Sequence, residues 1–437
     1  MASNPDFFER LYELLKHEEL RKALFVVIPT TILAGFWIGR FFPRYSAPPS
    51  QSSIPPAPDP RIAELEAIID DLKKQLSVTP EEVARARAAV SKSGPGLWLA
   101  IPPKPPSNYE LLRSSIPIYT VANLKGGVGK TTMAIGLASY FVNPFGKAGR
   151  RRERVLLVDL DFQGSLSSMA LTTKARIPSD GQQSRATRLI SGGCKPEDLV
   201  HMHQRVKGLD VIKGSAQIEF NAIPAYYDLA QAENRLLVEW LLSDGQKDIR
   251  YNLAEILLNP IIQDSYDRII IDAPPRLTTA HVQALAASTH VIVPTVLDQL
   301  SGEAVGSFVE QTIFHAKIWP YLKVLGVVGS MTEWGQDKQL QDYENEGIVA
   351  IRQALEQKKD QYSLRGDATK LFPRQSFIPE LKELGRAAGT RIGYLGVGQT
   401  SNERAAIEKV RAAFDSLGNA VVAALPEAKE LRDLVRP

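Results

Sequence analysis

One segment constrains the fold more than any other: an apolar run that leads through a glycine-rich loop straight into an apolar helix. Residues 116–122 read IPIYTVA, residues 123–132 read NLKGGVGKTT, and residues 133–141 read MAIGLASYF. The first run predicts a buried strand and the last a buried helix. A strand, a glycine loop and a helix in this order predict an α/β domain with a phosphate-binding loop.

The loop matches the G-x-x-x-x-G-K-[ST] pattern in altered form, because Leu124 stands where its first glycine is expected. The remaining glycines let the backbone turn so that its N–H groups face phosphate oxygens, and the helix start adds partial positive charge. Lys130 would reach the β- and γ-phosphates, and the Thr131 hydroxyl would ligate Mg²⁺. The predicted nucleotide-binding residues are Gly126, Gly127, Val128, Gly129, Lys130, Thr131 and Thr132.

Further motifs follow in order, and with the loop they resemble the ParA/MinD family of deviant Walker A ATPases. The clue inside the loop is its second lysine, Lys125, in KGGVGKTT. Residues 154–165 read RVLLVDLDFQGS, similar to the family's D-x-D-x-Q-G box, although Phe162 and Ser165 replace its usual proline and asparagine. Four later runs also resemble family boxes: YDRIIIDAPP, ALAASTHVIVPTVLDQLSGEAV, KVLGVVGSMTE and QSFIPELKELGRAAG.

The resemblance implies a slow, partner-stimulated ATP hydrolase that binds Mg-ATP and forms a homodimer around it. Its implied catalytic residues are Lys125, Lys130 and Asp161. Lys125 would cross the dimer interface to the partner's nucleotide. Asp161 would position or polarise the attacking water, a recurring requirement of phosphoryl transfer.

The resemblance also implies a metal site and one further nucleotide contact. Asp159 and Asp161 alternate at a strand end and therefore share a face. Asp159 and the Walker B residue Asp272 would join Thr131 in the Mg²⁺ shell, and Pro379 lies in the run that resembles the nucleotide-side loop. The simpler alternative is that Asp159 or Asp161 only caps a turn.

The pattern after residue 116 predicts an α/β fold: a doubly wound, mostly parallel sheet with helices on both faces. Apolar strand-like runs alternate with helical patterns there, as βαβ units require. The phosphates are expected at the C-terminal edge of the strands. The ATPase domain is expected over residues 116–425 and a tail over 426–437, with polar loop insertions at 172–191 and 334–374.

The chain before this domain divides by composition into five parts. They are an amphipathic N-terminal helix at 1–22, a transmembrane or membrane-inserted helix at 23–42, a Pro/Ser-rich linker at 43–60, a helical or coiled-coil segment at 61–93, and a Pro-rich linker at 94–115. In the fourth part, apolar residues from Ile62 to Leu76 recur at spacings of 3 and 4. Such a short seam packs on its own chain or forms an intermolecular coiled coil.

The second part is the basis for a membrane assignment. Residues 23–39 carry no charged side chain, and as a helix they would rise about 26 Å against a bilayer core of about 30 Å. Snorkelling of Arg40 would help to complete the span. A cleaved signal peptide and a buried helix of a soluble protein are the alternatives.

Two arguments on topology conflict. Positive-inside counting would keep the N-terminus in the cytoplasm, whereas ATP supply requires the catalytic domain there. We expect a bacterial inner-membrane protein with a single N-terminal anchor and a cytoplasmic ATPase domain. The fallback is a monotopic arrangement with both ends in the cytoplasm.

The charge and cysteine content narrow the possible partners and chemistry. The net charge is +3, from 52 basic and 49 acidic residues, which by itself implies no polyanion partner. Non-specific DNA binding is possible but not favoured, because the densest basic run, RRER at 151–154, reads as a solvated turn. Cys194 is the only cysteine, which excludes an intrachain disulfide and the paired cysteines of a nitrogenase-like reductase.

The expected function is a membrane-anchored nucleotide switch that positions, recruits or regulates an unidentified activator or cargo protein. One alternative is a bacterial tyrosine-kinase-like P-loop enzyme, although the last tyrosine is Tyr394 and the tail LPEAKELRDLVRP has none. The other is a scaffold with a non-hydrolysing ATP site. The complete set of site residues argues against that scaffold: Lys125, Lys130, Thr131, Asp159, Asp161 and Asp272.

Overall fold

A computed structural model describes the fold in two compact units. The residues described are 81, 96–179, 181–243, 245–333, 341–363, 370–380, 392–397 and 400–435. The first unit takes in residues 1–102 and 238–247, and the second takes in 103–237 and 248–437. In the first unit, Trp98 of the short helix η1 (Leu97–Leu99) stacks on Trp240 with ring centroids 5.8 Å apart.

The second unit is built on an eight-stranded sheet with the strand order β3-β4-β2-β5-β1-β6-β7-β8. All neighbouring strands are parallel except the edge pair β3 and β4, which is antiparallel. The predicted mostly parallel sheet is confirmed. The strands are β1 (Ile118–Val121), β2 (Val155–Asp159), β3 (Gln204–Arg205), β4 (Phe220–Ile223), β5 (Arg268–Asp272), β6 (His290–Val296), β7 (Lys323–Thr332) and β8 (Ile378–Pro379).

The central strands read as continuous apolar runs because both faces of a parallel sheet are covered. All residues of β1, β2, β4 and β5 are buried. In register, Asp272 lies opposite Val121 of β1 on one side and opposite Asp159 of β2 on the other. The three strands therefore end together, and the loops that leave them meet at one edge of the sheet.

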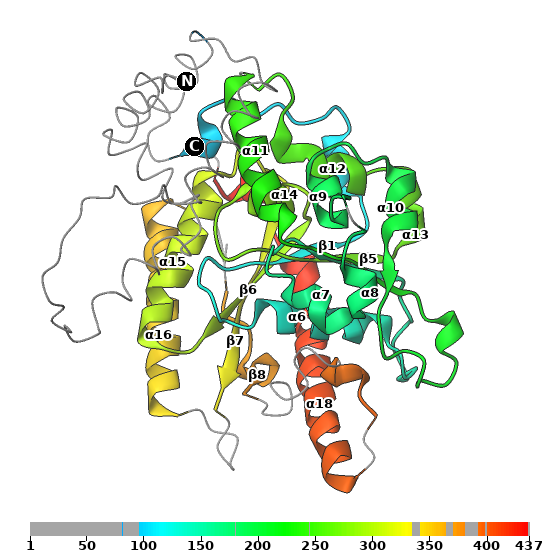
Figure 1. The fold of residues 1–437 in the computed structure, drawn as a ribbon. Helices are drawn as coiled ribbons and strands as arrows, with labels where there is room; N and C mark the ends of the chain where they lie inside the picture. Colours follow the sequence, from blue (N-terminus) through cyan, green and yellow to red (C-terminus); the bar gives the residue numbers. More distant parts are fainter. Residues whose placement is uncertain are drawn as a thin grey trace, which may run out of the picture. The chain divides into compact units, whose positions relative to one another are not determined.

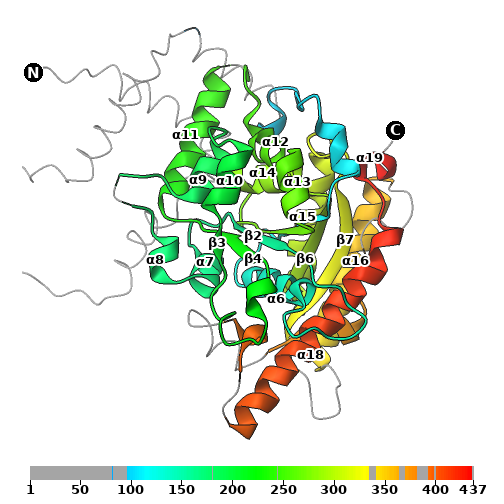
Figure 2. The same ribbon diagram turned by 90° about the vertical axis from the view of Figure 1, so that its right-hand side faces the viewer.

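Helices cover both faces of the sheet, with α6 and α18 on one side and α12 and α14 on the other (Figure 2). On a further flank, α15 and α16 run side by side (Figure 1), where Gly302 lies close to the backbone of Ala350. The α-helices are α6 (Lys130–Val142), α7 (Ser165–Ala170), α8 (Thr173–Arg176), α9 (Arg185–Ile190), α10 (Pro196–Met202), α11 (Asp228–Leu242), α12 (Asn252–Leu257), α13 (Pro260–Ser265), α14 (Thr279–Ala286), α15 (Gln299–Phe314), α16 (Asp342–Gln361), α18 (Ser401–Ala424) and α19 (Leu431–Leu434). The remaining short 3₁₀ helices are η2 (Tyr109–Arg113), η3 (Ser215–Gln217), η4 (Ile249–Tyr251), η5 (Arg374–Ser376), η6 (Gly393–Leu395) and η7 (Leu425–Glu427).

The helix that follows the glycine loop, α6, packs closely against α18. A Cβ atom built on Gly136 would lie 2.1 Å from the ring of Phe414 in α18. A Cβ atom built on Gly418 would lie 2.3 Å from the ring of Tyr140 in α6. Each helix thus has a glycine at the point where the other helix inserts an aromatic ring.

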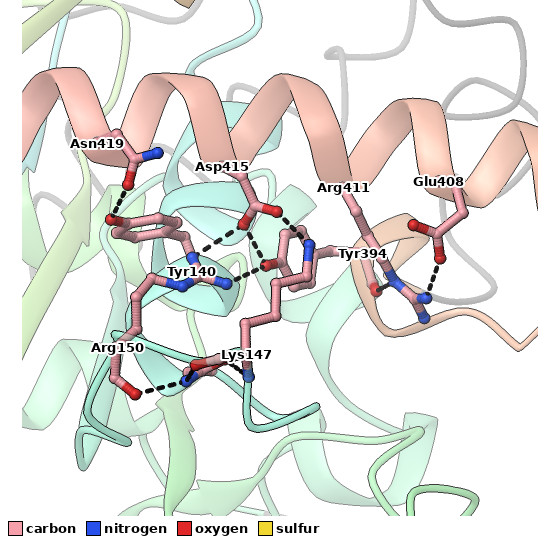
Figure 3. A network of polar contacts seen from close by, with 9 residues as sticks. Tyr140, Lys147, Arg150, Tyr394, Glu408, Arg411, Asp415 and Asn419 are labelled. Atoms are coloured by element: carbon pink, nitrogen blue, oxygen red, sulfur yellow. Dashed lines mark hydrogen bonds and ion pairs between the residues drawn. The ribbon is translucent and has the colours of Figure 1, made fainter.

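A polar network extends this contact to the loop after α6 (Figure 3). The carboxylate of Asp415 accepts hydrogen bonds from Lys147, from Nη1 of Arg150 at 2.9 Å and from the hydroxyl of Tyr394 at 2.6 Å. Arg411, one helical turn before Asp415, donates from Nε to the carbonyl of Tyr394 at 3.0 Å. The long helix α18 is therefore anchored to the nucleotide half of the sheet by both apolar and charged contacts.

Two expected loop insertions contain helices instead. The stretch at 334–374 includes the twenty-residue helix α16, whose Ile348 and Ile351 are buried. The stretch at 172–191 includes α8 and α9. Their polar composition suggested loops, but an amphipathic helix on a protein surface is also mostly polar.

The expected domain boundaries also differ from the structure. Residues 103–115, taken as linker, belong to the second unit: Tyr109 and Leu112 are buried, and the Tyr109 hydroxyl donates to the carbonyl of Ala286 at 2.6 Å. The expected tail packs as well, because Leu431 is buried and its N–H donates to the carbonyl of Leu322 at 2.9 Å. Proline-rich composition around Tyr109 and charged composition around Leu431 made both segments resemble linkers in the sequence.

The membrane and coiled-coil predictions fall outside what the structure describes. Residues 1–22, 23–42 and 43–60 lie outside the described residues, as does all of 61–93 except Glu81, which is helical. Within the described parts of the chain, no helix is both long enough and apolar enough to cross a membrane.

Candidate nucleotide site

The glycine loop between β1 and α6 has the backbone geometry of a phosphate cradle. Gly127 and Gly129 adopt φ values of +72° and +78°, a region that favours glycine. Gly129 is the N-cap of α6, so the helix begins at Lys130 with its first N–H groups directed toward the loop. Gly126 and Gly127 are exposed, which leaves the loop accessible to a ligand. This arrangement fits an anion at a helix N-terminus.

Lys130 is held at the centre of the loop. Its side chain is buried, and Nζ donates to the carbonyl oxygen of Lys125 at 2.9 Å. Burial lowers the pKa of Lys130, while Asp272 and Asp161 attract the ammonium and oppose that change. A phosphate at the loop would supply the charge partner that this partly desolvated cation needs.

Thr131 and Asp272 meet as the predicted metal site requires. The Thr131 hydroxyl donates to Oδ2 of Asp272 at 2.6 Å. Burial raises the pKa of Asp272 well above its usual range, and the nearby Asp159 raises it further. Two oxygen ligands from different elements thus lie side by side in a place where negative charge is costly.

Asp159 makes contacts that give it a positioning role. Its Oδ2 accepts from the backbone N–H of Ser167 at 2.8 Å and from the Ser167 hydroxyl at 2.6 Å. Its Oδ1 accepts from the N–H of Asp161 at 3.1 Å. Burial raises the pKa of Asp159 to about 7. These bonds match the turn-capping alternative, and a place for Asp159 in the Mg²⁺ shell stays a prediction.

Asp161 stands in the loop that leaves β2, beside Asp272 and Lys130. Its Oδ1 accepts from the N–H of Gln163 at 3.0 Å, which fixes the carboxylate in the turn before α7. Burial raises the pKa of Asp161, opposed by the Gln163 N–H and then by the charges of Lys130 and Arg276. The side chain is only partly buried, so a water molecule at the phosphates could reach it.

Lys125 is paired within its own chain. Its ammonium lies 3.1 Å from Oδ2 of Asp298 and 3.1 Å from the hydroxyl of Ser301. Asp298 is the N-cap of α15 and also accepts from the Ser301 N–H at 2.7 Å. Burial would raise the pKa of Asp298, but the hydrogen bonds from Ser301 and Lys125 hold it below its usual range. The predicted reach of Lys125 into a partner would first break this pair.

Sequence reasoning missed two residues that brace the loop. Asn123 donates from Nδ2 to the carbonyl of Pro294 at 2.8 Å and accepts from the N–H of Lys125 at 3.0 Å. The Ser330 hydroxyl is 2.8 Å from the carbonyl of Val128 and 3.1 Å from that of Thr295. Both are polar side chains at the C-terminal ends of buried strands, and that position was the available signal.

Pro379 lies at the same edge of the sheet as the loop. It pairs in register with Thr332 of β7, two residues beyond Ser330. The N–H of Glu380 donates to the carbonyl of Thr332 at 2.8 Å, which fixes this end of β8. A nucleotide contact from Pro379 stays a prediction based on this placement. Of the other predicted residues, Val128 is buried and Thr132 is partly exposed.

The residues at this edge suit Mg²⁺. Carboxylate and hydroxyl oxygens are the ligands that Mg²⁺ prefers, and Asp272 and Thr131 already present two of them. A divalent cation would offset the charge of the buried carboxylates. Among the described residues, no three His, Cys, Asp or Glu side chains form a metal cage. This fits an ion that completes its shell with phosphate oxygens and water.

The arginines of the basic run at 150–154 are partly paired with carboxylates of the same chain. Arg150 pairs with Asp415 at 2.9 Å, and Arg151 and Arg154 both pair with Asp267, at 2.8 and 3.2 Å. Residues 151–154 form a loop, as the sequence predicted. Arg151 and Arg154 share the one carboxylate of Asp267, so the positive charge of this run is only partly offset by carboxylates of the same chain.

Known proteins are similar to parts of this chain in sequence and in fold. A family model for an AAA domain matches residues 116–318. The chromosome-partitioning ATPase Soj of Thermus thermophilus is 32% identical over 51% of this chain and 72% of its own length. The sporulation initiation inhibitor protein Soj of Bacillus subtilis is 32% identical over 40% of this chain and 57% of its own length. An ATP complex of McdA from Cyanothece has the same fold, with a TM-score of 0.50 and 18% identity over 70% of this chain and 97% of that one.

Proposed function

This chain belongs to the Soj/ParA family of P-loop ATPases, and on that basis we propose that it is a Mg-ATP-dependent dimerising switch that positions, recruits or regulates a partner at a membrane. The observation that carries the proposal is the meeting of Lys130, Thr131, Asp161 and Asp272 at the glycine loop. It combines a phosphate cradle, a metal-binding pair and a carboxylate that can orient water.

Each residue of the site has a separate role in ATP binding or hydrolysis. The loop N–H groups and Lys130 hold the phosphates, because phosphoryl transfer depends mostly on positioning and charge neutralisation. Thr131 and Asp272 would hold Mg²⁺, which neutralises charge on the β- and γ-phosphates when bound. Asp161 orients the attacking water. Asp159 holds the Asp161 turn and the start of α7 in place.

Dimerisation on ATP is the step that would turn hydrolysis into a switch. Lys125 lies at the exposed rim of the loop, and its partner Asp298 is 39% exposed, so the pair can separate without unfolding the sheet. In a closed interface, a phosphate of the partner's nucleotide would offer Lys125 a stronger charge partner than a half-exposed carboxylate. Family membership supports this ATP-dependent homodimer.

A hydrolysis assay tests the proposed function. We expect purified full-length chain in detergent to release phosphate from ATP slowly, and only with Mg²⁺. Light scattering should detect a dimer with ATP that ADP does not support. A chain that binds ATP without releasing phosphate would instead fit the scaffold alternative, and phosphate recovered on tyrosine would fit the kinase alternative.

The membrane anchor at 23–42 remains part of the proposal, supported by the absence of charged side chains from residues 23–39. Deleting residues 1–42 should release an ATP-binding protein from bacterial membranes. Single cysteines at positions 3 and 50, introduced in a Cys194→Ser background, can be labelled in intact cells to report topology. Labelling of position 50 from outside would refute a cytoplasmic ATPase domain.

A further inference from the structure

The loop that leaves β5 brings an arginine next to the water-orienting carboxylate. β5 and β2 are neighbouring parallel strands with Asp272 opposite Asp159. The backbone continues this contact, because the Leu160 N–H donates to the carbonyl of Asp272 at 3.0 Å. The loops that follow, with Asp161 on one and Arg276 on the other, therefore leave the sheet side by side.

Buried side chains fasten the Arg276 loop at both ends. At its start, His281 of α14 lies 2.9 Å from the carbonyl of Pro274 through Nδ1, which must carry the proton. At its end, the carboxylate of Glu233 in α11 accepts a hydrogen bond from the Ala280 N–H at 2.8 Å. The backbone carbonyl of Glu233 accepts another from the Thr279 hydroxyl at 3.0 Å. His281 is fully buried, which lowers its pKa to about 4 and keeps it neutral near pH 7.

The turn itself is closed by the backbone. The Thr278 N–H donates to the carbonyl of Arg276 at 2.8 Å. These fastening bonds come from the backbone and from the side chains of His281, Glu233 and Thr279. A rigid loop that presents a partly exposed arginine is what preorganised charge stabilisation requires.

The charges around Asp161 come from several elements. Lys130 of the glycine loop and Arg276 of the β5 loop both stabilise the Asp161 carboxylate. Asp272 of β5 and the buried Glu233 of α11 oppose it electrostatically. Two cations from different loops thus act on the Asp161 carboxylate, at the edge of the sheet where the γ-phosphate would be expected.

We propose that Arg276 is a catalytic residue of the ATPase, supplied by the same chain, and that its guanidinium binds the γ-phosphate during hydrolysis. This inference rests on the proposed function. In the reaction the water oxygen bonds to the γ-phosphorus, the bond to the β–γ bridging oxygen breaks, and ADP leaves with that electron pair. The water proton ends on the phosphate product or on Asp161. Arg276 stays protonated and neutralises charge that grows on the γ-phosphoryl oxygens.

The test compares full-length wild-type chain with Arg276→Ala and Arg276→Lys. A matched control is Arg188→Ala, because Arg188 is a half-exposed arginine on α9 paired with Asp198 at 3.7 Å. We expect Arg276→Ala to slow single-turnover hydrolysis of Mg-ATP about 100-fold. It should weaken the Mg-ADP-aluminium fluoride complex by a similar factor and change the affinity for ADP less than about threefold. Lysine should restore little, since it lacks the planar fork of arginine.

Chemical rescue separates a catalytic role from a structural one. Millimolar guanidinium should partly restore hydrolysis by Arg276→Ala and leave Arg188→Ala unaffected. Hydrolysis by Arg276→Ala at the wild-type rate would overturn the inference. So would an equal loss of affinity for ADP and for the aluminium fluoride complex. A wild-type chain that hydrolyses no ATP would overturn the proposed function as well, which keeps the two failures apart.

Discussion

The two sides of the glycine loop carry opposite arrangements of charge. On the β2–β5 side, Asp159 and Asp272 are buried, and burial raises the pKa of both. On the α15 side, Lys125 and Asp298 are partly exposed and neutralise one another. On the first side the carboxylates of Asp159, Asp161 and Asp272 outnumber the ammonium of Lys130 that attracts them, whereas on the second side one cation is paired with one anion.

The acidic side can therefore bind a cation directly. The lysine side can make a new contact only after the ion pair between Lys125 and Asp298 has separated. A bound Mg²⁺ would offset the negative charge of the carboxylates on the acidic side. On the lysine side, any new contact competes with an existing ion pair of modest strength, as expected for partly exposed groups. Mg²⁺ binding and hydrolysis should therefore depend on the acidic side, and dimerisation on the exchange of partners by Lys125.

The largest expected effect tests the acidic side. Asp161→Ala should bind ATP normally but hydrolyse it about 100-fold more slowly or worse, because a positioned acid–base group typically contributes that much. The ATP-bound dimer should then accumulate. Single-turnover phosphate release, measured beside ATP affinity, checks this. Normal hydrolysis would show that another group orients the water.

Removing the ammonium of Lys130 should weaken ATP binding and not only slow hydrolysis. Lys130→Ala should weaken ATP affinity about 10- to 100-fold, the range for losing a charged hydrogen bond. Titration calorimetry with Mg-ATP measures it. The matched control is Lys174→Ala, which removes an exposed lysine on α8. Equal affinities for the two variants would contradict the role of Lys130.

The lysine side should respond in two directions. Lys125→Ala should prevent the ATP-dependent dimer, whereas Asp298→Asn should favour it about tenfold by freeing Lys125 from an ion pair. Asparagine caps a helix as well as aspartate, so α15 should keep its start. Light scattering with ATP measures both variants. Weaker dimerisation of Asp298→Asn would mean that the pair supports the closed state.

The smallest expected effect concerns pH. Burial raises the pKa of Glu233 to about 7, against hydrogen bonds from Thr278 and Ala280 that lower it. The stabilising contribution of its protonated form is present below about pH 4 and is lost as pH rises through about 7, with a slope of at most about 1.4 kcal/mol per pH unit.

Thermal unfolding of Glu233→Gln and of the wild type, at pH 5 and pH 8 without nucleotide, measures the contribution of Glu233 protonation to stability. The melting temperature of the wild type should fall more with rising pH than that of the variant, because glutamine does not ionise. Parallel pH profiles would indicate that Glu233 is charged throughout the range.

Much of the nucleotide half could be predicted from the sequence because its signals are local. The run from Ile118 to Thr131 specifies strand, turn and helix in consecutive residues, and the structure has them in that order. The resemblance to the ParA/MinD family implied that Thr131 and Asp272 share a metal site, and in the structure their side chains meet.

Other parts depend on contacts that no local pattern encodes. Asp298 lies 173 residues from Lys125, so its pairing with the loop could not be inferred from spacing. The helix α16 was missed because its exposed face is highly charged, and its buried face is recognised only beside α15. Tyr109 was assigned to a linker because the prolines around it outweighed one aromatic ring.

The contact between α6 and α18 restricts how this chain can evolve. Gly136 accommodates Phe414, and Gly418 accommodates Tyr140, so a larger residue at either glycine would collide with a ring on the opposite helix. A substitution at one position becomes tolerable only after its partner has become smaller. Across descendants of this sequence, the two pairs should therefore change together, each glycine with its own aromatic residue and independently of the other pair.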